Sequence, residues 1–101
     1  VTAPTANYGT ALKVGAYYNG LAVFGGLLDE VSVFDSALSA SNITSIYNSG
    51  VPNDLSALSP VGWWRMGDND GGTGTTITDQ GSGGNNGTLT NSPTYSTSVP
   101  S

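Results

Sequence analysis

A group of oxygen-bearing side chains follows the tryptophan pair in the second half of the chain. Calcium binds six to eight oxygens from carboxylates, amides and backbone carbonyls, and intervening glycines let carbonyls turn inward. The pattern therefore predicts either a calcium site or a series of Asx-turns made by the same side chains. The predicted calcium ligands are Asp68, Asp70, Asp79 and Asn85, with Asn69 and Asn86 beside them.

An EF-hand is excluded for this stretch, although Asp68-Asn69-Asp70-Gly71 resembles the start of such a loop. The twelfth position carries Asp79 in place of the bidentate glutamate, and the flanking sequence predicts no helix on either side. Calcium remains the one cofactor that the sequence suggests.

Adjacent carboxylates occur at Asp29 and Glu30, inside a stretch with strand character. Neighbouring residues of a strand point to opposite faces, whereas a glycosidase needs two carboxylates that converge across one bond. The pair is therefore expected to be structural, with one side chain making backbone or turn hydrogen bonds and the other facing solvent. We predict that the chain is not an enzyme.

Four aromatic side chains are the least committed to the predicted core. Exposed aromatic faces stack on sugar rings, while nearby Asn and Asp side chains exchange hydrogen bonds with sugar hydroxyls. The alternative is that these rings pack at an edge of the domain or in a protein interface. The candidate glycan-binding residues are Tyr17, Tyr18, Trp63 and Tyr95.

Composition restricts the possible functions. The 101 residues include no Cys and no His, which excludes zinc and redox sites as well as Ser-His-Asp or Cys-His catalysis. The net charge of −5, with only Lys13 and Arg65 as basic residues, makes nucleic acid an unsuitable partner.

The longest apolar run, residues 21 to 28, is interrupted by glycines and is far shorter than the ~20 residues that span a bilayer, so no membrane insertion is predicted. Because the chain begins at Val1 without Met, we expect it to be part of a longer protein.

The clearest strand covers residues 26 to 34, where Val31 and Val33 lie on one face of a period-two pattern. Other strands are predicted at residues 11 to 15, 21 to 24, 61 to 68, 75 to 79 and 85 to 91, separated by turns rich in Gly and Asn. The predicted core consists of Leu12, Val14, Phe24, Leu28, Val31, Val33, Ile43, Ile46, Tyr47, Trp64, Met66 and Ile77.

A short helix is predicted near residues 40 to 48, because apolar residues recur there at a spacing of three and four. The Ser39 hydroxyl is expected to cap its N-terminus by accepting from the backbone amide of Asn42. Gly50 is expected to take the left-handed conformation that ends the helix.

The stretch from Gly26 to Gly50 reads G-L-L-D-E-V-S-V-F-D-S-A-L-S-A-S-N-I-T-S-I-Y-N-S-G. It resembles the closing segment of laminin G-like (concanavalin A-like) jelly-roll domains, except that Asn42 stands where the family often has a capping Glu. The stretch from Trp63 to Asn91 resembles the opening segment of such domains. The resemblance implies an all-β fold, an antiparallel β-sandwich with one short helix near residues 40 to 48. It also implies a calcium site at the sandwich rim, as in some members.

Three regions are expected along the chain. Residues 1 to 10 form an N-terminal arm, residues 11 to 91 form the sandwich, and residues 92 to 101 form a C-terminal tail. Within the sandwich, residues 11 to 50 are the closing-type half and residues 61 to 91 the opening-type half.

The order of these halves predicts self-association or pairing with the remainder of a longer parent chain. Closing elements precede opening elements, and few charges protect the predicted strand edges. We therefore expect residues 61 to 91 of one copy to complete the sheet begun by residues 11 to 34 of another copy, or a missing part of the parent chain to do so.

The resemblance implies a non-catalytic surface module for adhesion or glycan binding, located extracellularly or on a virion surface. The alternative is a structural or decoration protomer of a particle or filament, which assembles through strand pairing and binds no ligand.

Two sequons for N-glycosylation are present, at Asn42 and Asn86, and Asn86 lies in the more accessible predicted loop.

Overall fold

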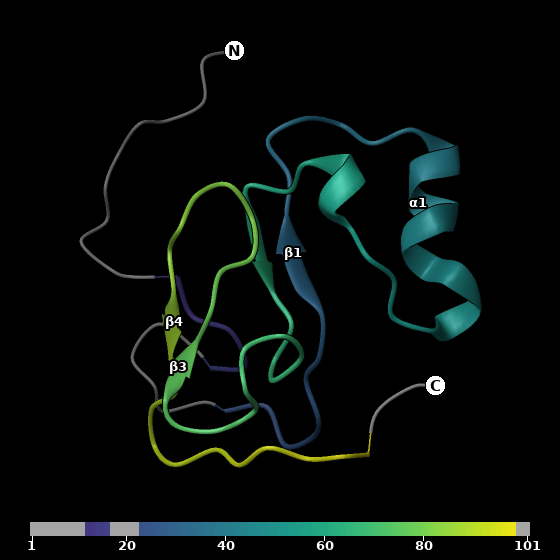
Figure 1. Cartoon of the computed structure of the whole chain (residues 1–101). Coiled ribbons are helices and arrows are strands. Elements are labelled where there is room, and N and C mark those ends of the chain that lie inside the picture. Colours follow the sequence, from purple (N-terminus) through teal and green to yellow (C-terminus); the bar gives the residue numbers. More distant parts are fainter. Residues whose placement is uncertain (1–11, 17–22, 99–101) are drawn as a thin grey trace.

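The computed structural model describes residues 12–16 and 23–98 of the chain (Figure 1). Within these residues, four short strands form two separate two-stranded antiparallel sheets, β1 with β2 and β3 with β4. One helix and two 3-10 turns lie between the first two strands. In chain order the elements are β1 (Val31–Val33), α1 (Ala40–Tyr47), η1 (Asn48–Gly50), η2 (Ser56–Leu58), β2 (Gly62–Trp64), β3 (Thr76–Ile77) and β4 (Gly87–Thr88).

The first sheet joins segments about thirty residues apart in sequence. Ser32 stands opposite Trp63, and the amide of Val61 donates to the carbonyl of Val33 at 2.9 Å. The strand predicted at residues 26 to 34 is confirmed only over its last part, because Glu30 has a φ of 54° and interrupts the extended backbone. On its other side β2 contacts the segment after β3 through a bridge between Trp64 and Asp79. Thus β2 lies in the middle of the fold.

The predicted helix is confirmed at α1, and its N-terminus is the predicted one. The amide of Asn42 donates to the Ser39 hydroxyl at 3.1 Å, which satisfies one of the free amides of the first turn. The left-handed conformation expected at Gly50 begins earlier, at Asn48, where φ is 42°. Asparagine tolerates this conformation, so the helix ends at Tyr47, and Gly50 follows with φ of 84°.

The core is small and differs from the predicted one. Among the described residues only Leu55, Trp63 and Ile77 are buried hydrophobic side chains, each 4% exposed. Of the predicted core only Ile77 is therefore confirmed as buried. Four predicted members are half-buried, namely Val31, Ile46, Trp64 and Met66. For the other seven the prediction is wrong, since the structure exposes Leu12, Val14, Phe24, Leu28, Val33, Ile43 and Tyr47.

These side chains are exposed because few elements of the structure pack over them. The helix α1 lies on the side of β1 that faces away from β3 and β4, and none of its residues is buried (Figure 1). Among the described residues, the one bridge of residues 23 to 28 is that between Ala16 and Val23, and these residues belong to neither two-stranded sheet. The β-sandwich of laminin G-like type stays a prediction.

The sheet pairing bears on the expected exchange between copies. Residues 62 to 64 pair with residues 31 to 33 of the same chain, whereas we expected residues 61 to 91 to pair with residues 11 to 34 of another copy, or a missing part of the parent chain to complete the sheet. Self-association is therefore not needed to form this sheet.

In the described ranges no helix has the length and apolar character required to traverse a bilayer.

Candidate functional site

A groove opens between the turn that follows β2 and the segment around Tyr95. Its volume is about 320 Å³. The residues lining it are Asp29, Met66, Gly67, Asp68, Gly72, Tyr95, Ser96 and Thr97, and we call it the acidic groove. A smaller hollow of about 180 Å³ lies on the helix side of Asp29 and is lined by Asp29, Glu30, Ile46, Tyr47, Gly50, Val51 and Pro52.

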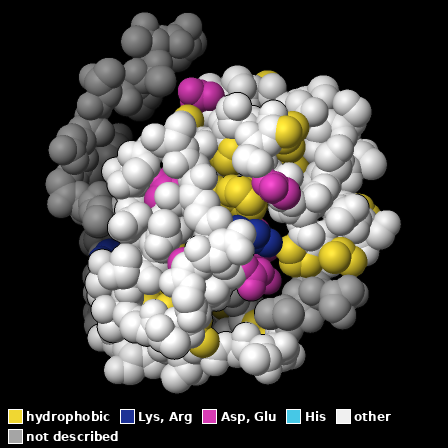
Figure 2. Space-filling model, in the orientation of Figure 1, with side chains coloured by type: hydrophobic (Ala, Val, Ile, Leu, Met, Phe, Trp, Pro, Cys, Tyr) yellow, Lys and Arg dark blue, Asp and Glu magenta, His cyan; other side chains and the backbone are white. Residues whose placement is uncertain are grey.

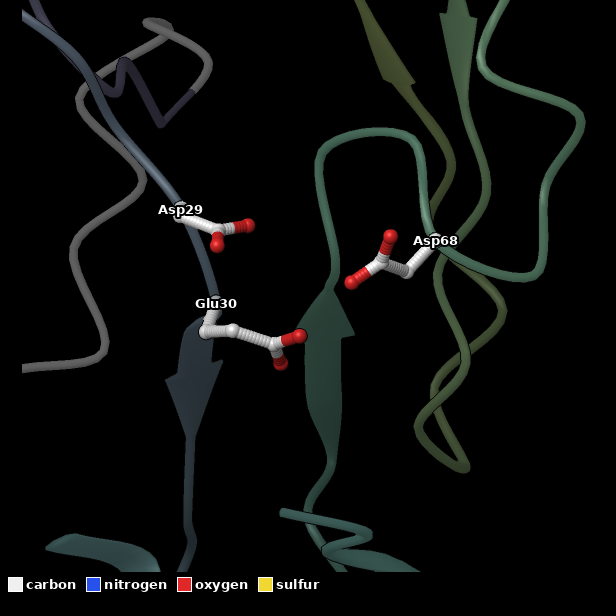
Figure 3. Close-up of side chains that lie close together, drawn as sticks. All are labelled: Asp29, Glu30 and Asp68. Atoms are coloured by element: carbon white, nitrogen blue, oxygen red, sulfur yellow. The ribbon is translucent and has the colours of Figure 1, made fainter. Parts of the chain in front are cut away.

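Three carboxylates meet at the edge of the acidic groove. Asp29, Glu30 and Asp68 each offer an oxygen within 4.8 Å of the other two, and Figure 3 shows the side chains pointing toward one another from two segments. The prediction that Asp29 and Glu30 point to opposite faces is wrong. Glu30 precedes β1 and has a positive φ, so the strand alternation does not hold at this pair.

One guanidinium faces this cluster. The Nε of Arg65 lies 2.8 Å from Glu30 Oε1, while an Nη lies 3.7 Å from Asp68 Oδ2. Glu30 also accepts, through Oε2, a hydrogen bond of 2.9 Å from the indole N–H of Trp63. Both oxygens of Glu30 are therefore engaged, and three carboxylates share one cation.

Asp29 is the least satisfied member of the cluster. Its Oδ2 is buried and has no hydrogen-bond partner. Burial raises the pKa of Asp29, and the nearby carboxylates of Glu30 and Asp68 raise it further, against weaker opposing effects of the Glu30 backbone amide and of Arg65. The folded chain therefore holds an ionised Asp29 less favourably than the unfolded chain does.

Replacing Asp29 with asparagine is expected to raise the free energy of unfolding at pH 7 by at most about 0.5 kcal/mol, because the neutral amide removes repulsion from two carboxylates that solvent already screens. A raised pKa in the folded state contributes stability that is complete below the ordinary value of 3.8 and is lost as pH rises through the raised value. Urea denaturation at pH 7 measures the change, with Asp35→Asn as a charge-matched control at an exposed position outside the cluster. A variant less stable than wild type at pH 7 would contradict this account of the cluster.

The four predicted calcium ligands are not brought together. Among the described residues, Asp29, Glu30 and Asp68 form the one group of three acids close enough to share an ion, and Asp70 and Asp79 lie outside it. Asp70 accepts from the amide of Gly72 at 3.2 Å, as in an Asx-turn, while its Oδ2 is buried without a partner.

Asp79 organises the loops beside β2. Its Oδ1 accepts from the amides of Trp63 at 2.9 Å and Gly81 at 2.8 Å, and its Oδ2 accepts from the amide of Asn85 at 2.8 Å. Its own amide donates to Asn86 Oδ1 at 3.0 Å. Burial alone would raise the pKa of Asp79, but these three backbone donors lower it overall. The alternative prediction of an Asx-turn is confirmed at Asp79, through its bond from the amide of Gly81. Asn86 instead bonds a residue seven positions earlier, and Asn85 contributes its backbone amide.

The aromatic candidates separate into three outcomes. Trp63 is 4% exposed, so the prediction that its face is free to stack on a sugar is wrong. Its ring is enclosed because β2 lies between β1 and the segment after β3, and the Arg65 guanidinium sits over it at 5.0 Å. Tyr95 is half-buried in the acidic groove, where its hydroxyl donates to the carbonyl of Thr73 at 3.3 Å. Tyr17 and Tyr18 fall outside the described residues.

The structure thus joins two predictions that the sequence kept apart, since Tyr95 from the glycan set and Asp68 from the calcium set line the same groove. Sequence reasoning missed Asp29 and Glu30 as members of this site. Arg65 could have indicated a carboxylate cluster, because it is the one basic residue in the second half of the chain and a guanidinium removed from water requires a carboxylate partner.

No family model, curated protein or solved structure matches the chain.

Proposed function

We propose that the chain is a non-catalytic surface module that acts in adhesion or glycan binding within an extracellular or virion-associated protein. The observation that supports this best is the acidic groove, which combines the ring of Tyr95 with the carboxylates of Asp29 and Asp68. Its volume of about 320 Å³ is near the lower end for small-ligand sites. The resemblance of two segments to laminin G-like domains adds support from the sequence.

The groove has the chemistry that a sugar requires. The Tyr95 ring lines the groove, and its hydroxyl donates a long hydrogen bond of 3.3 Å to the carbonyl of Thr73, which favours one position of the ring. Asp29 and Asp68 are acceptors for sugar hydroxyls, and Ser96 and Thr97 add hydroxyls of their own to the lining. An aromatic wall with a few converging polar groups is typical of carbohydrate and other small-ligand sites.

A structural protomer is the second candidate, and a different observation favours it. Ten large hydrophobic side chains are exposed among the described residues, against three that are buried. Figure 2 shows several hydrophobic side chains open on one face of the molecule. In addition, β1 pairs with β2 alone in the described ranges, which leaves its other edge open. Apolar surface and an open strand edge are the features that association between chains would cover.

Glycan-array binding with Tyr95 variants tests the proposal. We expect the wild-type chain to bind a subset of glycans, Tyr95→Ala to weaken that binding at least tenfold, and Tyr95→Phe to retain most of it, because the phenyl ring keeps the stacking face. Tyr47→Ala is the matched control, since Tyr47 is 68% exposed and does not line the acidic groove. Equal binding by wild type and Tyr95→Ala would exclude the groove as the glycan site.

Sedimentation of the same samples separates the two candidates. Absence of binding to every glycan on the array, together with concentration-dependent association, would favour the structural protomer. A monomer that binds no glycan would contradict both. Hydrolysis of a bound oligosaccharide would contradict the non-catalytic assignment.

A further inference from the structure

We propose that Asn86 is a site of spontaneous covalent modification, at which the side-chain amide is converted to aspartate or isoaspartate, and that the pairing of β3 with β4 slows this reaction in the folded chain. Asn86 is exposed and is followed directly by Gly87, the first residue of β4. The reaction needs only water as a co-reactant. It therefore requires no ligand and does not depend on the proposed function.

The nucleophile of this reaction is the backbone nitrogen of Gly87. It loses its proton to solvent base and attacks Cγ of Asn86, and a cyclic succinimide forms as the Cγ–Nδ2 bond breaks and ammonia leaves. Water then opens the ring at one of its two carbonyls. Breaking the new N–Cγ bond gives aspartate, whereas breaking the original peptide bond gives isoaspartate. One water is consumed and one ammonia is released, with no change of oxidation state.

The glycine that follows Asn86 is the reason that this asparagine is the reactive one. Without a Cβ at position 87, the backbone nitrogen approaches the side-chain carbon with little steric hindrance. The other asparagines that follow Arg65 in the sequence are not followed by glycine; they are Asn69, Asn85 and Asn91. One further Asn-Gly pair, Asn19-Gly20, lies outside the described residues.

The fold restrains the electrophile, which is the side-chain amide of Asn86. Its Oδ1 accepts a hydrogen bond of 3.0 Å from the backbone amide of Asp79. Asp79 is itself 7% exposed and is held by backbone donors from the neighbouring loops, among them the amide of Gly81 at 2.8 Å. The Asn86 side chain is therefore bonded to a fixed point and is not free to rotate toward the nitrogen of Gly87.

The sheet restrains the nucleophile. Gly87 stands opposite Ile77, and two residues further along the ladder the amide of Leu89 donates to the carbonyl of Thr75 at 2.7 Å. Hydrogen-bonded pairs recur at every second residue of an antiparallel ladder, so Gly87 and Ile77 form such a pair. In this pair the amide of Gly87 points toward β3, which directs it away from Asn86 and shields it from solvent base.

This restraint is local and therefore weak. β3 and β4 pair over two residues each (Figure 1). A short ladder near the surface opens locally at a lower free energy than the whole domain unfolds. The rate of modification in the folded chain should accordingly follow the fraction of time for which β4 is detached from β3.

The modification has a consequence for the loops beside β2. Isoaspartate adds one carbon to the backbone directly after Asn85, whose amide donates to Asp79 Oδ2 at 2.8 Å. The same Asp79 side chain accepts from the amide of Trp63 at 2.9 Å, so a displaced Asn85 weakens a contact that extends to the core. Either product also adds one negative charge to the net charge of −5.

Incubation of the full chain at pH 8, in buffer and in concentrated urea, tests the proposal. Trypsin cleaves after Lys13 and Arg65, so residues 66 to 101 are released as one fragment that contains Asn86 and not Asn19. Tandem mass spectrometry of this fragment locates aspartate and isoaspartate. We expect both products at Asn86, formed at least tenfold more slowly in buffer than in urea, because in buffer β4 must first detach. The other three asparagines of the fragment are internal controls and should keep their amides over the same period.

Gly87→Ala is the variant that tests the nucleophile. A Cβ at this position would lie 3.7 Å or more from Ile77 and Trp64, an ordinary contact distance, so the fold should be retained, which circular dichroism checks. We expect conversion of Asn86 in urea to become at least tenfold slower, because the methyl group hinders the attack. This measurement does not depend on the fold of the variant.

Three outcomes would overturn the proposal. An unchanged rate in Gly87→Ala would exclude the nitrogen of Gly87 as the nucleophile. Equal rates for the wild-type chain in buffer and in urea would exclude the restraint by β3 and β4. Absence of conversion at Asn86 in urea would exclude the site itself.

Discussion

Replacing Trp63 with alanine is expected to lower the free energy of unfolding by about 4 kcal/mol, in the range seen when a buried aromatic side chain is truncated. The ring is 4% exposed and is one of three buried hydrophobic side chains in the described structure. Its removal also leaves Glu30 without the indole donor at 2.9 Å and removes the ring beneath Arg65. Urea denaturation followed by circular dichroism measures the loss.

Two control variants make this result interpretable. Trp63→Phe keeps an apolar ring and should cost less than the alanine variant, the remaining loss reflecting the indole N–H and the smaller volume. Leu12→Ala truncates a residue that the sequence predicts in the core but that is 73% exposed, so its effect should stay within about 0.5 kcal/mol. A larger effect at Leu12 than at Trp63 would contradict the position of the core described above.

Replacing Asp79 with asparagine is the second variant with a large expected effect. Asn keeps one oxygen but presents its NH₂ to a backbone N–H, either that of Asn85 or those of Trp63 and Gly81. The resulting donor–donor contact leaves an amide unsatisfied at a residue that is 7% exposed. We expect a loss of about 2 to 3 kcal/mol.

The pH dependence of stability gives this prediction a second measurement. The lowered pKa of Asp79 contributes stability that is complete above the ordinary value of 3.8 and is lost as pH falls through the lower folded-state value. Wild type should therefore lose stability below about pH 3.8, and Asp79→Asn should lose less over the same interval. Parallel pH profiles for the two proteins would show that another carboxylate carries the acid sensitivity.

Elements whose signals are local were predicted well. The cap of α1 depends on one hydroxyl and an amide three residues later, and both are visible in the sequence as Ser39 and Asn42. The strand Val31–Val33 follows from β-branched residues at period two. Such contacts need no information about distant parts of the chain.

Elements that depend on distant contacts were not predicted. The alternation along β2 correctly separates Trp63 from Trp64, but it does not say which face is buried. The apolar Met66 favoured the face of Trp64, whereas the structure buries Trp63 and leaves the Arg65 side chain 14% exposed, and both bond to Glu30, more than thirty residues earlier. Ion pairing between distant segments thus reversed the choice made from hydrophobicity alone.

The acidic groove shows the same limitation. Its carboxylates come from Asp29 and Glu30, which precede β1, and from Asp68, which follows β2. The cluster also requires the positive φ of Glu30, and a glutamate at this position does not indicate such a conformation, as a glycine or an asparagine would. Tyr95 and Asp68 were both selected as candidates from the sequence. Their proximity depends on the path of the C-terminal segment, which has no periodic pattern of apolar residues.

Glu30 connects the groove with the interior of the molecule. It neighbours Asp29 in the carboxylate cluster, and its other contacts are the indole of Trp63 and the guanidinium of Arg65. For a ligand bound in the groove as proposed, we therefore expect affinity and core stability to be thermodynamically linked. Such linkage is reciprocal: whatever the ligand does to the packing of Trp63, a change at Trp63 does to the affinity for the ligand. Loss of ligand binding on truncation of Trp63 would consequently report this linkage through Glu30 and would not identify the tryptophan as a contact residue.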